Sequence, residues 1–216
     1  MADLILPDGA RHAPATLRNR HALLSVLRAS FARKASILEI ASGTGEHGHF
    51  FTSQQPGWRW QPSDPDAAAL ASIESWRGSA PAALAPPIML DVCDPHWPAA
   101  STPPYDGVFC ANMIHIAPPE ATVGLCKCAA AQLRSGGIFV LYGPFMMGGE
   151  HSAPSNAAFD ESLKARDPAW GIRDLGDVVD LARRHQLVHQ KTHAMPANNL
   201  CLVFHKTQAA PTSTLI

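Results

Sequence analysis

A carboxylate within an apolar run, followed by a glycine-rich turn, is the segment of this chain best suited to binding a charged ligand. Glu39 lies in the run 37–40, and Gly43 and Gly45 follow directly. A strand, a tight glycine turn and a helix N-terminus place backbone N–H groups and the helix dipole against a nucleotide-like ligand. Glu39 would repel phosphates, but it suits the ammonium and sulfonium groups of S-adenosylmethionine. We therefore expect this cofactor, bound by Glu39, Gly43 and Gly45.

Two other functions remain open. Gly48 follows Gly43 and Gly45 and nearly completes the G-x-G-x-x-G fingerprint, so an NAD-dependent oxidoreductase is an alternative. Against it stand Glu39 and the absence of a Tyr-x-x-x-Lys or similar hydride-transfer pattern. The second alternative is a module that binds S-adenosylmethionine without turnover.

Polar residues also end the apolar segments that follow the glycine turn. Asp64 follows Gly43 by 21 residues, where a carboxylate accepts hydrogen bonds from ribose hydroxyls, and its neighbour Asp66 is an alternative for this role. Asp91 and Asn112 end the next two segments. Because ligands of open parallel sheets bind at the carboxyl ends of the strands, we expect these residues to share one site.

Composition indicates an ordinary globular protein of one domain. The chain has 216 residues, 46% of them hydrophobic, and a formal net charge of −1. Without a basic excess, nucleic acid is not an expected partner. The first residues do not resemble a signal peptide, and no apolar run approaches the roughly 18 residues of a membrane span. We expect a cytoplasmic protein with no membrane contact, and a small-molecule substrate as its partner.

The cysteines and histidines do not predict a metal site. The five cysteines are an odd number, and no second pair accompanies Cys126 and Cys128, so we expect small buried or half-buried side chains. Among the eleven histidines, His47 and His49 fall in one predicted helix without further ligands. We expect no metal.

Strands and helices are predicted to alternate, which indicates a parallel sheet with helices on both faces. In the leading helix, Leu17 is expected on the apolar side, and Arg18 and Asn19 on another face. The predicted helices are 14–31, 46–55, 66–77, 119–134 and 174–185, and the predicted strands are 37–41, 58–62, 87–91, 107–111, 137–142, 188–194 and 200–205.

The segment 143–171 interrupts this alternation. It is rich in Gly, Pro, Ser and Met and has no strong periodicity. A loop of this length in a compact domain is more often a lid or binding loop than a passive connection. Its polar residues include His151 and Asp160, either of which can act as a base. We therefore expect one domain over 1–206 with a lid insertion at about 143–171, and a flexible tail over 207–216.

Almost the whole chain, from about Ala13 to Lys206, resembles the methyltransferase-like family of unknown substrate that includes methyltransferase-like protein 26. The resemblance lies in Arg18-Asn19, LEIASGTGEH (38–47), WQPSDPD (60–66), LDV (90–92), CANMIHIAP (110–118), YGPF (142–145), SNAAFD (155–160), WGIRD (170–174) and MPANNLCLVF (195–204). It implies a Rossmann-like class I α/β fold with seven mostly parallel strands, the last antiparallel, and binding of S-adenosylmethionine.

The resemblance also implies roles for several residues. Asp91 is expected to meet the exocyclic amine of adenine, with Val92 offering its N–H. Asn19 is expected to close over the cofactor together with Arg18, which we also place beside the substrate. Asn156 is expected to reach the substrate from the lid. The resemblance supplies no identity for that substrate.

Methyl transfer from a sulfonium is an in-line displacement, so the protein has mainly to align the reacting groups. A base is needed only when an oxygen or nitrogen acceptor has to lose a proton. Asn112 takes the position close to the methyl group. His115, with an unperturbed pKa near 6.5, is the expected base, and Tyr142 is expected to donate to the acceptor. His151 is a second candidate beside the substrate.

Overall fold

Strands and helices alternate along the chain as predicted. The computed structural model describes residues 6–79, 83–96 and 104–207. The helices are α1 (Pro14–Ser30), α2 (Glu46–Gln54), α3 (Ala67–Gly78), α4 (Pro119–Gln132), α5 (Pro154–Arg166) and α6 (Leu175–Arg184), with short 3-10 turns η1 (Ile114–Ile116) and η2 (Pro196–Asn198). The strands are β1 (Ala35–Ile40), β2 (Trp58–Asp64), β3 (Ile88–Met89), β4 (Tyr105–Ala111), β5 (Leu133–Gly143), β6 (Met146–Met147), β7 (Glu150–His151), β8 (Leu187–Met195) and β9 (Asn199–Lys206).

Seven strands form one sheet in the order β3-β2-β1-β4-β5-β9-β8. Strands β1 to β5 pair in parallel, whereas β9 is antiparallel to both β5 and β8. The predicted mostly parallel sheet with an antiparallel last strand is therefore confirmed. The direction of strand order reverses between β1 and β4, which is where open α/β sheets bind their ligands.

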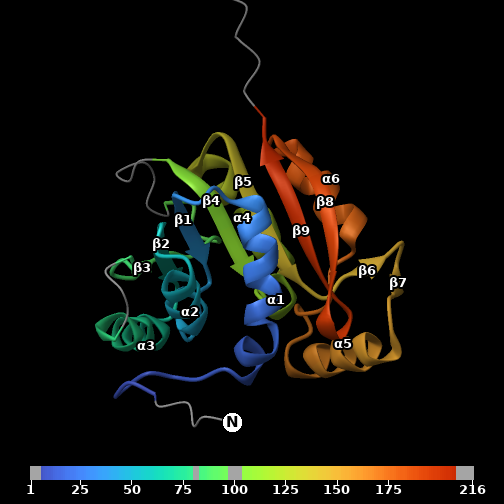
Figure 1. Ribbon diagram of the computed structural model, residues 1–216. Helices are drawn as coiled ribbons and strands as arrows, with labels where there is room; N and C mark the ends of the chain where they lie inside the picture. Colours follow the sequence, from blue (N-terminus) through green and yellow to red (C-terminus); the bar gives the residue numbers. More distant parts are fainter. Residues whose placement is uncertain (1–5, 80–82, 97–103, 208–216) are drawn as a thin grey trace, which may run out of the picture.

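Helices cover both faces of the sheet. Helices α1 and α2 pack over one face, in a core that includes Phe51, Trp60 and Phe109, and α4 and α6 pack over the other. Figure 1 shows helix α5 below the sheet, on the side where β1 and β4 end. The carboxyl edge of the sheet is thus enclosed between the beginning of α1 and α5.

The predicted lid contains regular structure that the sequence did not indicate. Segment 143–171 forms the hairpin β6–β7, which turns at Gly148 and Gly149, and then the 13-residue helix α5. The prediction of an irregular loop was wrong, because the helix has only a weak apolar stripe and buries little beyond Asn156, Asp160 and Leu163.

Two predictions for α1 were also wrong. Leu17 is 39% exposed, while Asn19 is buried at 4% exposure.

The strand predicted over 87–91 is shorter in the structure, where β3 contains only Ile88 and Met89. Asp91 therefore does not end the strand but follows it after Leu90. The tail predicted over 207–216 lies almost entirely outside the described residues.

The cysteines are free thiols. Those at 110, 126, 128 and 201 are buried as expected, but Cys93 is exposed, contrary to the prediction. In the described part of the chain, none of the helices combines the length and apolar character that crossing a membrane requires.

Gly124 in α4 allows the helix to touch the chain after β3. A Cβ at Gly124 would lie 2.0 Å from the carbonyl oxygen of Val92, a backbone atom that cannot rotate away. We expect Gly124→Ala to lower the free energy of unfolding by about 1–3 kcal/mol, as overpacking usually does. Gly78→Ala, where a Cβ would meet nothing within 4 Å, is the control and should cost nothing. Urea unfolding of both variants measures this, and equal stabilities would contradict it.

Candidate active site

The turn between β1 and α2 has an unusual backbone. Ala41, Gly43 and Gly45 have φ angles of 56°, 57° and 84°. At Gly45 a Cβ would lie 2.9 Å from the Cα of Ile73 in α3, so this glycine also allows two helices to pack closely. At Gly43 a Cβ would meet nothing within 4 Å. The backbone of Gly43 is therefore exposed on the side where a ligand can approach.

Asp64 holds this turn in place. Its carboxylate accepts hydrogen bonds from the backbone N–H of Gly43 at 2.8 Å and of Asp66 at 3.0 Å. Burial raises the pKa of Asp64, although these hydrogen bonds oppose the shift. A carboxylate has further lone pairs, so Asp64 can still accept from ribose hydroxyls. Asp66 instead caps α3 through Ala68 N–H and is exposed, which favours Asp64 of the two candidates.

Glu39 lies beneath the turn. Its carboxylate accepts a hydrogen bond from Trp60 Nε1 at 2.9 Å, and the residue is only 2% exposed. Burial raises the pKa of Glu39 to about 7, against the effect of the Trp60 hydrogen bond. Asp64 adds a smaller unfavourable interaction between like charges. A cation bound nearby would relieve both effects, so contact with an ammonium group stays a prediction.

Asp91 and Val92 follow β3 near the same edge. Asp91 is exposed and accepts a hydrogen bond from Cys93 N–H at 2.8 Å. Val92 is buried against α4 through the close approach of Gly124. The structure therefore leaves the Asp91 carboxylate accessible, as the predicted contact with adenine requires.

A pocket of about 510 Å³ opens beside the ends of β4 and β5. Helices α1 and α5 and the turn before β9 supply its other walls. The predicted site residues that line it are Arg18, Asn19, Asn112, His115, Tyr142 and Asn156. Ser155, a polar residue of the predicted lid, also lines it. Residues that the sequence did not predict for the site complete the lining: Ala15, Ile116, Pro144, Phe159, Pro196, Ala197 and Asn199. The sequence thus located the polar half of the pocket and missed most of its apolar half.

His115 is a buried ionisable group of this pocket. It is 4% exposed, its ring meets the ring of Phe159 edge-on at 5.6 Å, and its Nδ1 makes no hydrogen bond to any described residue. Burial, and secondarily the charge of Arg173, lowers the pKa of His115 to about 4. The imidazole is therefore neutral at physiological pH, with a ring nitrogen that lacks a partner.

Asn112 and Tyr142 lie side by side at the ends of neighbouring strands. Asn112 has a φ of 57°, and its N–H donates to the carbonyl of Tyr142 at 2.9 Å. Burial raises the pKa of Tyr142, while a hydrogen bond from Asn19 acts against this shift. The phenol is therefore un-ionised at neutral pH and available as a donor.

The lid contributes Asn156 but not His151. Asn156 donates to Ser152 Oγ and to the carbonyl of Asn198, each at 3.0 Å, which ties α5 to the turn before β9. His151 lies 3.4 Å from the carboxylate of Asp160 and does not line the pocket. The structure therefore separates the predicted substrate residue His151 from the pocket, because its ring turns toward α5.

Asp160 is likewise unsuited to be a base. Burial raises its pKa, but hydrogen bonds from Lys164 Nζ and Ile172 N–H, each at 2.6 Å, outweigh burial and hold the pKa below its usual range. Its carboxylate is thus occupied in holding α5 against the chain that follows.

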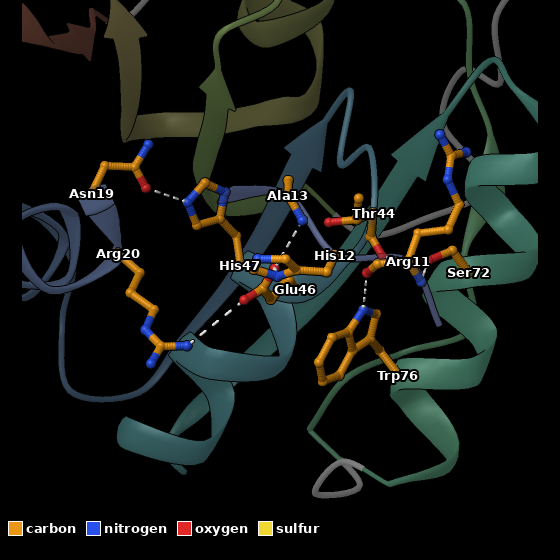
Figure 2. A network of polar contacts seen from close by, with 10 residues as sticks. All are labelled: Arg11, His12, Ala13, Asn19, Arg20, Thr44, Glu46, His47, Ser72 and Trp76. Atoms are coloured by element: carbon orange, nitrogen blue, oxygen red, sulfur yellow. Dashed lines mark hydrogen bonds and ion pairs between the residues drawn. The ribbon is translucent and has the colours of Figure 1, made fainter. Parts of the chain in front are cut away.

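Glu46 opens helix α2 directly after the glycine turn (Figure 2). It is 1% exposed, accepts hydrogen bonds from His12 Nδ1 at 2.9 Å and Ala13 N–H at 3.3 Å, and pairs with Arg20 at 3.7 Å. A carboxylate in the first turn is stabilised by the helix dipole. Its negative charge lies where dinucleotide-binding folds hold a pyrophosphate, which disfavours the NAD alternative.

Gly48, the third glycine of the incomplete G-x-G-x-x-G pattern, allows close packing. A Cβ at Gly48 would lie 2.9 Å from Trp60 Cδ1, so this glycine lets α2 approach β2. Within the described ranges, no group of three or more His, Cys, Asp or Glu side chains is arranged to hold a metal ion.

Solved structures with a similar fold include methyltransferases. The S-adenosylmethionine-dependent methyltransferase SibL superposes with a TM-score of 0.73 at 18% identity, over 90% of this chain and 56% of that one. Human N-acetylserotonin methyltransferase in complex with SAM gives 0.72 at 13% identity, over 90% and 53%. A complex of the Haloferax volcanii Trm112 methyltransferase activator and a putative methyltransferase gives 0.69 at 12%, over 89% and 92%.

The chain therefore spans little more than half the length of SibL and of the human enzyme. At these identities the likeness shows the fold, which is that of the Rossmann-like S-adenosylmethionine-dependent methyltransferases. A family model matches residues 10–206. Because this match extends over nearly all of the sequence, the chain belongs to the family described as Protein of unknown function (DUF938).

Proposed function

We propose that this protein is an S-adenosylmethionine-dependent methyltransferase that acts on a small-molecule acceptor. The observation that carries this proposal is the pocket at the ends of β4 and β5, at the same edge of the sheet where strand order reverses between β1 and β4. It contains a neutral, unpartnered imidazole, His115, beside an amide and a phenol. The resemblance to the family that includes methyltransferase-like protein 26 supports the same activity.

The residues around the turn fit the cofactor. Gly43 has open space above its Cα, Asp64 has lone pairs for ribose hydroxyls, and the Asp91 carboxylate is exposed for adenine. Glu39 provides a buried acid whose ionisation a cationic ligand would favour. When bound, S-adenosylmethionine would supply the methyl group on its sulfonium.

The chain's own residues would align the acceptor and manage its proton. Helices α1 and α5 form two walls of the pocket, and Asn112 and Tyr142 present polar groups at the strand ends. His115 would accept a proton from an oxygen or nitrogen acceptor, because its imidazole is neutral at physiological pH and the residue lines the pocket. Alignment contributes most to such an in-line displacement.

The size of the pocket supports a small acceptor. About 510 Å³ is within the usual range of small-molecule sites. The net charge of −1 offers no basic surface for nucleic acid. Incubation with radiolabelled S-adenosylmethionine and fractionated metabolites is the assay for the acceptor. Transfer only to RNA or protein would contradict this part of the proposal.

Cofactor affinity should depend on Asp64. Calorimetry should show binding of S-adenosylmethionine and S-adenosylhomocysteine but not of NAD. Asp64→Asn should weaken binding by about 1–3 kcal/mol, because ribose and Gly43 lose a charged acceptor. Asp66→Asn is the matched control, since asparagine also caps helices well, and its affinity should be unchanged. Binding of NAD in preference to S-adenosylmethionine would refute the assignment.

Binding of S-adenosylmethionine should also be linked to ionisation of Glu39. The pKa of Glu39 is about 7 in the free protein, and a nearby cation favours the carboxylate. Binding near pH 7 should therefore release protons, and affinity should rise as the pH increases through 7. Glu39→Gln keeps an acceptor for Trp60 but cannot titrate, so its affinity should be weaker and nearly independent of pH. Calorimetry in buffers of different ionisation enthalpy counts the protons, and pH-independent binding by the unaltered protein would contradict the linkage.

Turnover should depend on His115. A general base contributes typically about 10²- to 10⁴-fold, so His115→Gln should lower kcat by that range while S-adenosylhomocysteine affinity stays the same. Protonated histidine cannot accept a proton, so the rate should fall as the pH drops toward about 4, where burial places the pKa of His115. His151→Gln in the lid serves as the control. If His115→Gln retained normal turnover of an acceptor that must lose a proton, His115 would be a structural residue.

A further inference from the structure

Three hydrogen-bond donors meet at one corner of the pocket. Arg18 and Asn19 come from the first turns of α1, and Tyr142 comes from the end of β5. We call these three residues the donor corner. Its chemistry depends on which way the Asn19 amide points, because an amide offers a donor on one side and an acceptor on the other.

His47 sets the direction of that amide. Its Nε2 lies 2.8 Å from Asn19 Oδ1, so the imidazole donates and the amide oxygen accepts. Figure 2 shows the oxygen of Asn19 turned toward His47 and its nitrogen turned away. The amide oxygen of Asn19 therefore already has a hydrogen-bond partner within the protein. Its NH₂ group can donate to Tyr142 and to a ligand in the pocket.

The His47 ring is held in one orientation. It stacks on Phe51 with ring centroids 5.3 Å apart and meets Phe109 edge-on at 6.1 Å. Burial, and secondarily the charge of Arg20, lowers the pKa of His47 to about 4, so the ring is neutral and carries a single N–H. In this state the N–H has to be on Nε2 to satisfy Asn19 Oδ1.

Arg18 adds a positive charge that nothing nearby neutralises. It is exposed and forms no ion pair or hydrogen bond with any described residue, whereas Arg20 of the same helix pairs with Glu46. No carboxylate lines the pocket. The donor corner therefore offers a guanidinium, an amide NH₂ and a phenol O–H, a combination that matches a planar anionic oxygen pair.

We propose that the donor corner is a carboxylate-binding subsite and that His47 is its positioning residue. The placement of this subsite beside methyl transfer rests on the proposed function, but its existence does not. Two ligands can supply the carboxylate: the amino-acid end of the cofactor, or an acid group on the acceptor. In both cases His47 acts only through Asn19.

Titration of the full chain distinguishes the two sources. S-adenosylhomocysteine carries a carboxylate, and 5′-methylthioadenosine lacks the amino-acid end. If the cofactor supplies the carboxylate, Arg18→Gln and Tyr142→Phe should each weaken S-adenosylhomocysteine binding about 10-fold, as loss of a charged hydrogen bond does, and leave 5′-methylthioadenosine unaffected. If the acceptor supplies the carboxylate, the same variants should instead weaken the binding of benzoate but not that of benzamide, both measured with saturating S-adenosylhomocysteine. Arg33→Gln, which removes an exposed cation outside the pocket, is the control.

The role of His47 needs a measurement that a purely structural role would not change. His47→Phe should lower the affinity for the ligand that carries the carboxylate and leave the affinity for the matching ligand without it unchanged. In a protein that already carries Asn19→Leu, His47→Phe should cause no further loss of affinity. His47→Gln retains an N–H donor and should restore part of the preference. His49→Phe on the same helix faces Trp76 and is the matched control. Equal weakening of both ligands by His47→Phe would show that His47 only supports the fold.

The subsite is refuted if Arg18→Gln and Tyr142→Phe change neither the preference for S-adenosylhomocysteine over 5′-methylthioadenosine nor the preference for benzoate over benzamide. The proposed function fails separately, if the unaltered protein binds neither S-adenosylhomocysteine nor 5′-methylthioadenosine. In that event benzoate and benzamide titrated into the free protein still test the donor corner, and equal affinities would overturn it.

Discussion

The hydrogen bond from Gly43 N–H to the Asp64 carboxylate joins the turn after β1 to the end of β2, and the candidate site depends on this connection. The turn passes through positive φ angles at Ala41, Gly43 and Gly45, a conformation that needs outside support. Part of that support is a ladder between the same two segments, in which Ser42 N–H donates to the carbonyl of Ser63 at 2.9 Å. Asp64 thus stabilises the turn and, under the proposed function, would also bind the cofactor, and its burial strengthens its hydrogen bonds because fewer waters compete for its oxygens.

Burial also sets the protonation states across the site, in opposite directions for acids and bases. It raises the pKa of Glu39 to about 7 and lowers those of His47 and His115 to about 4, because the charged form of each group loses hydration. At neutral pH the pocket therefore has one neutral imidazole, His115, an un-ionised phenol and one unpaired guanidinium, Arg18. Such an environment lets a single introduced charge, from a cofactor or an acceptor, dominate the electrostatics.

Much of the fold could be predicted because its signals are local. The glycine turn, the polar strand ends and the alternation of strands and helices each occupy a few adjacent residues, and Asp64, Asn112, His115 and Tyr142 were found from them. The remainder depends on contacts between distant segments. Burial of Asn19 follows from His47 in α2, the pairing of His151 with Asp160 follows from the fold of the lid, and α5 is stabilised by packing that its weak periodicity does not reveal. Phe159 and His47 lie within the matched motifs SNAAFD and LEIASGTGEH, so the motifs were a signal for both, whereas the contact of His47 with Asn19 depends on the packing of α2 against α1.

Helix α1 connects the two halves of the site. Its Arg18 and Asn19 face the acceptor pocket, while Arg20 pairs with Glu46 at the beginning of α2 (Figure 2). The chain just before α1 is fastened to the same region, since Arg11 N–H donates to Ser72 Oγ and that hydroxyl donates to the carbonyl of Thr44 in the glycine turn, both at 2.8 Å. The position of α1, and with it the direction of the donor corner, is therefore fixed by contacts to the turn that would hold the cofactor. A ligand that shifts this turn has a direct structural route to the pocket wall, through Glu46 and Arg20.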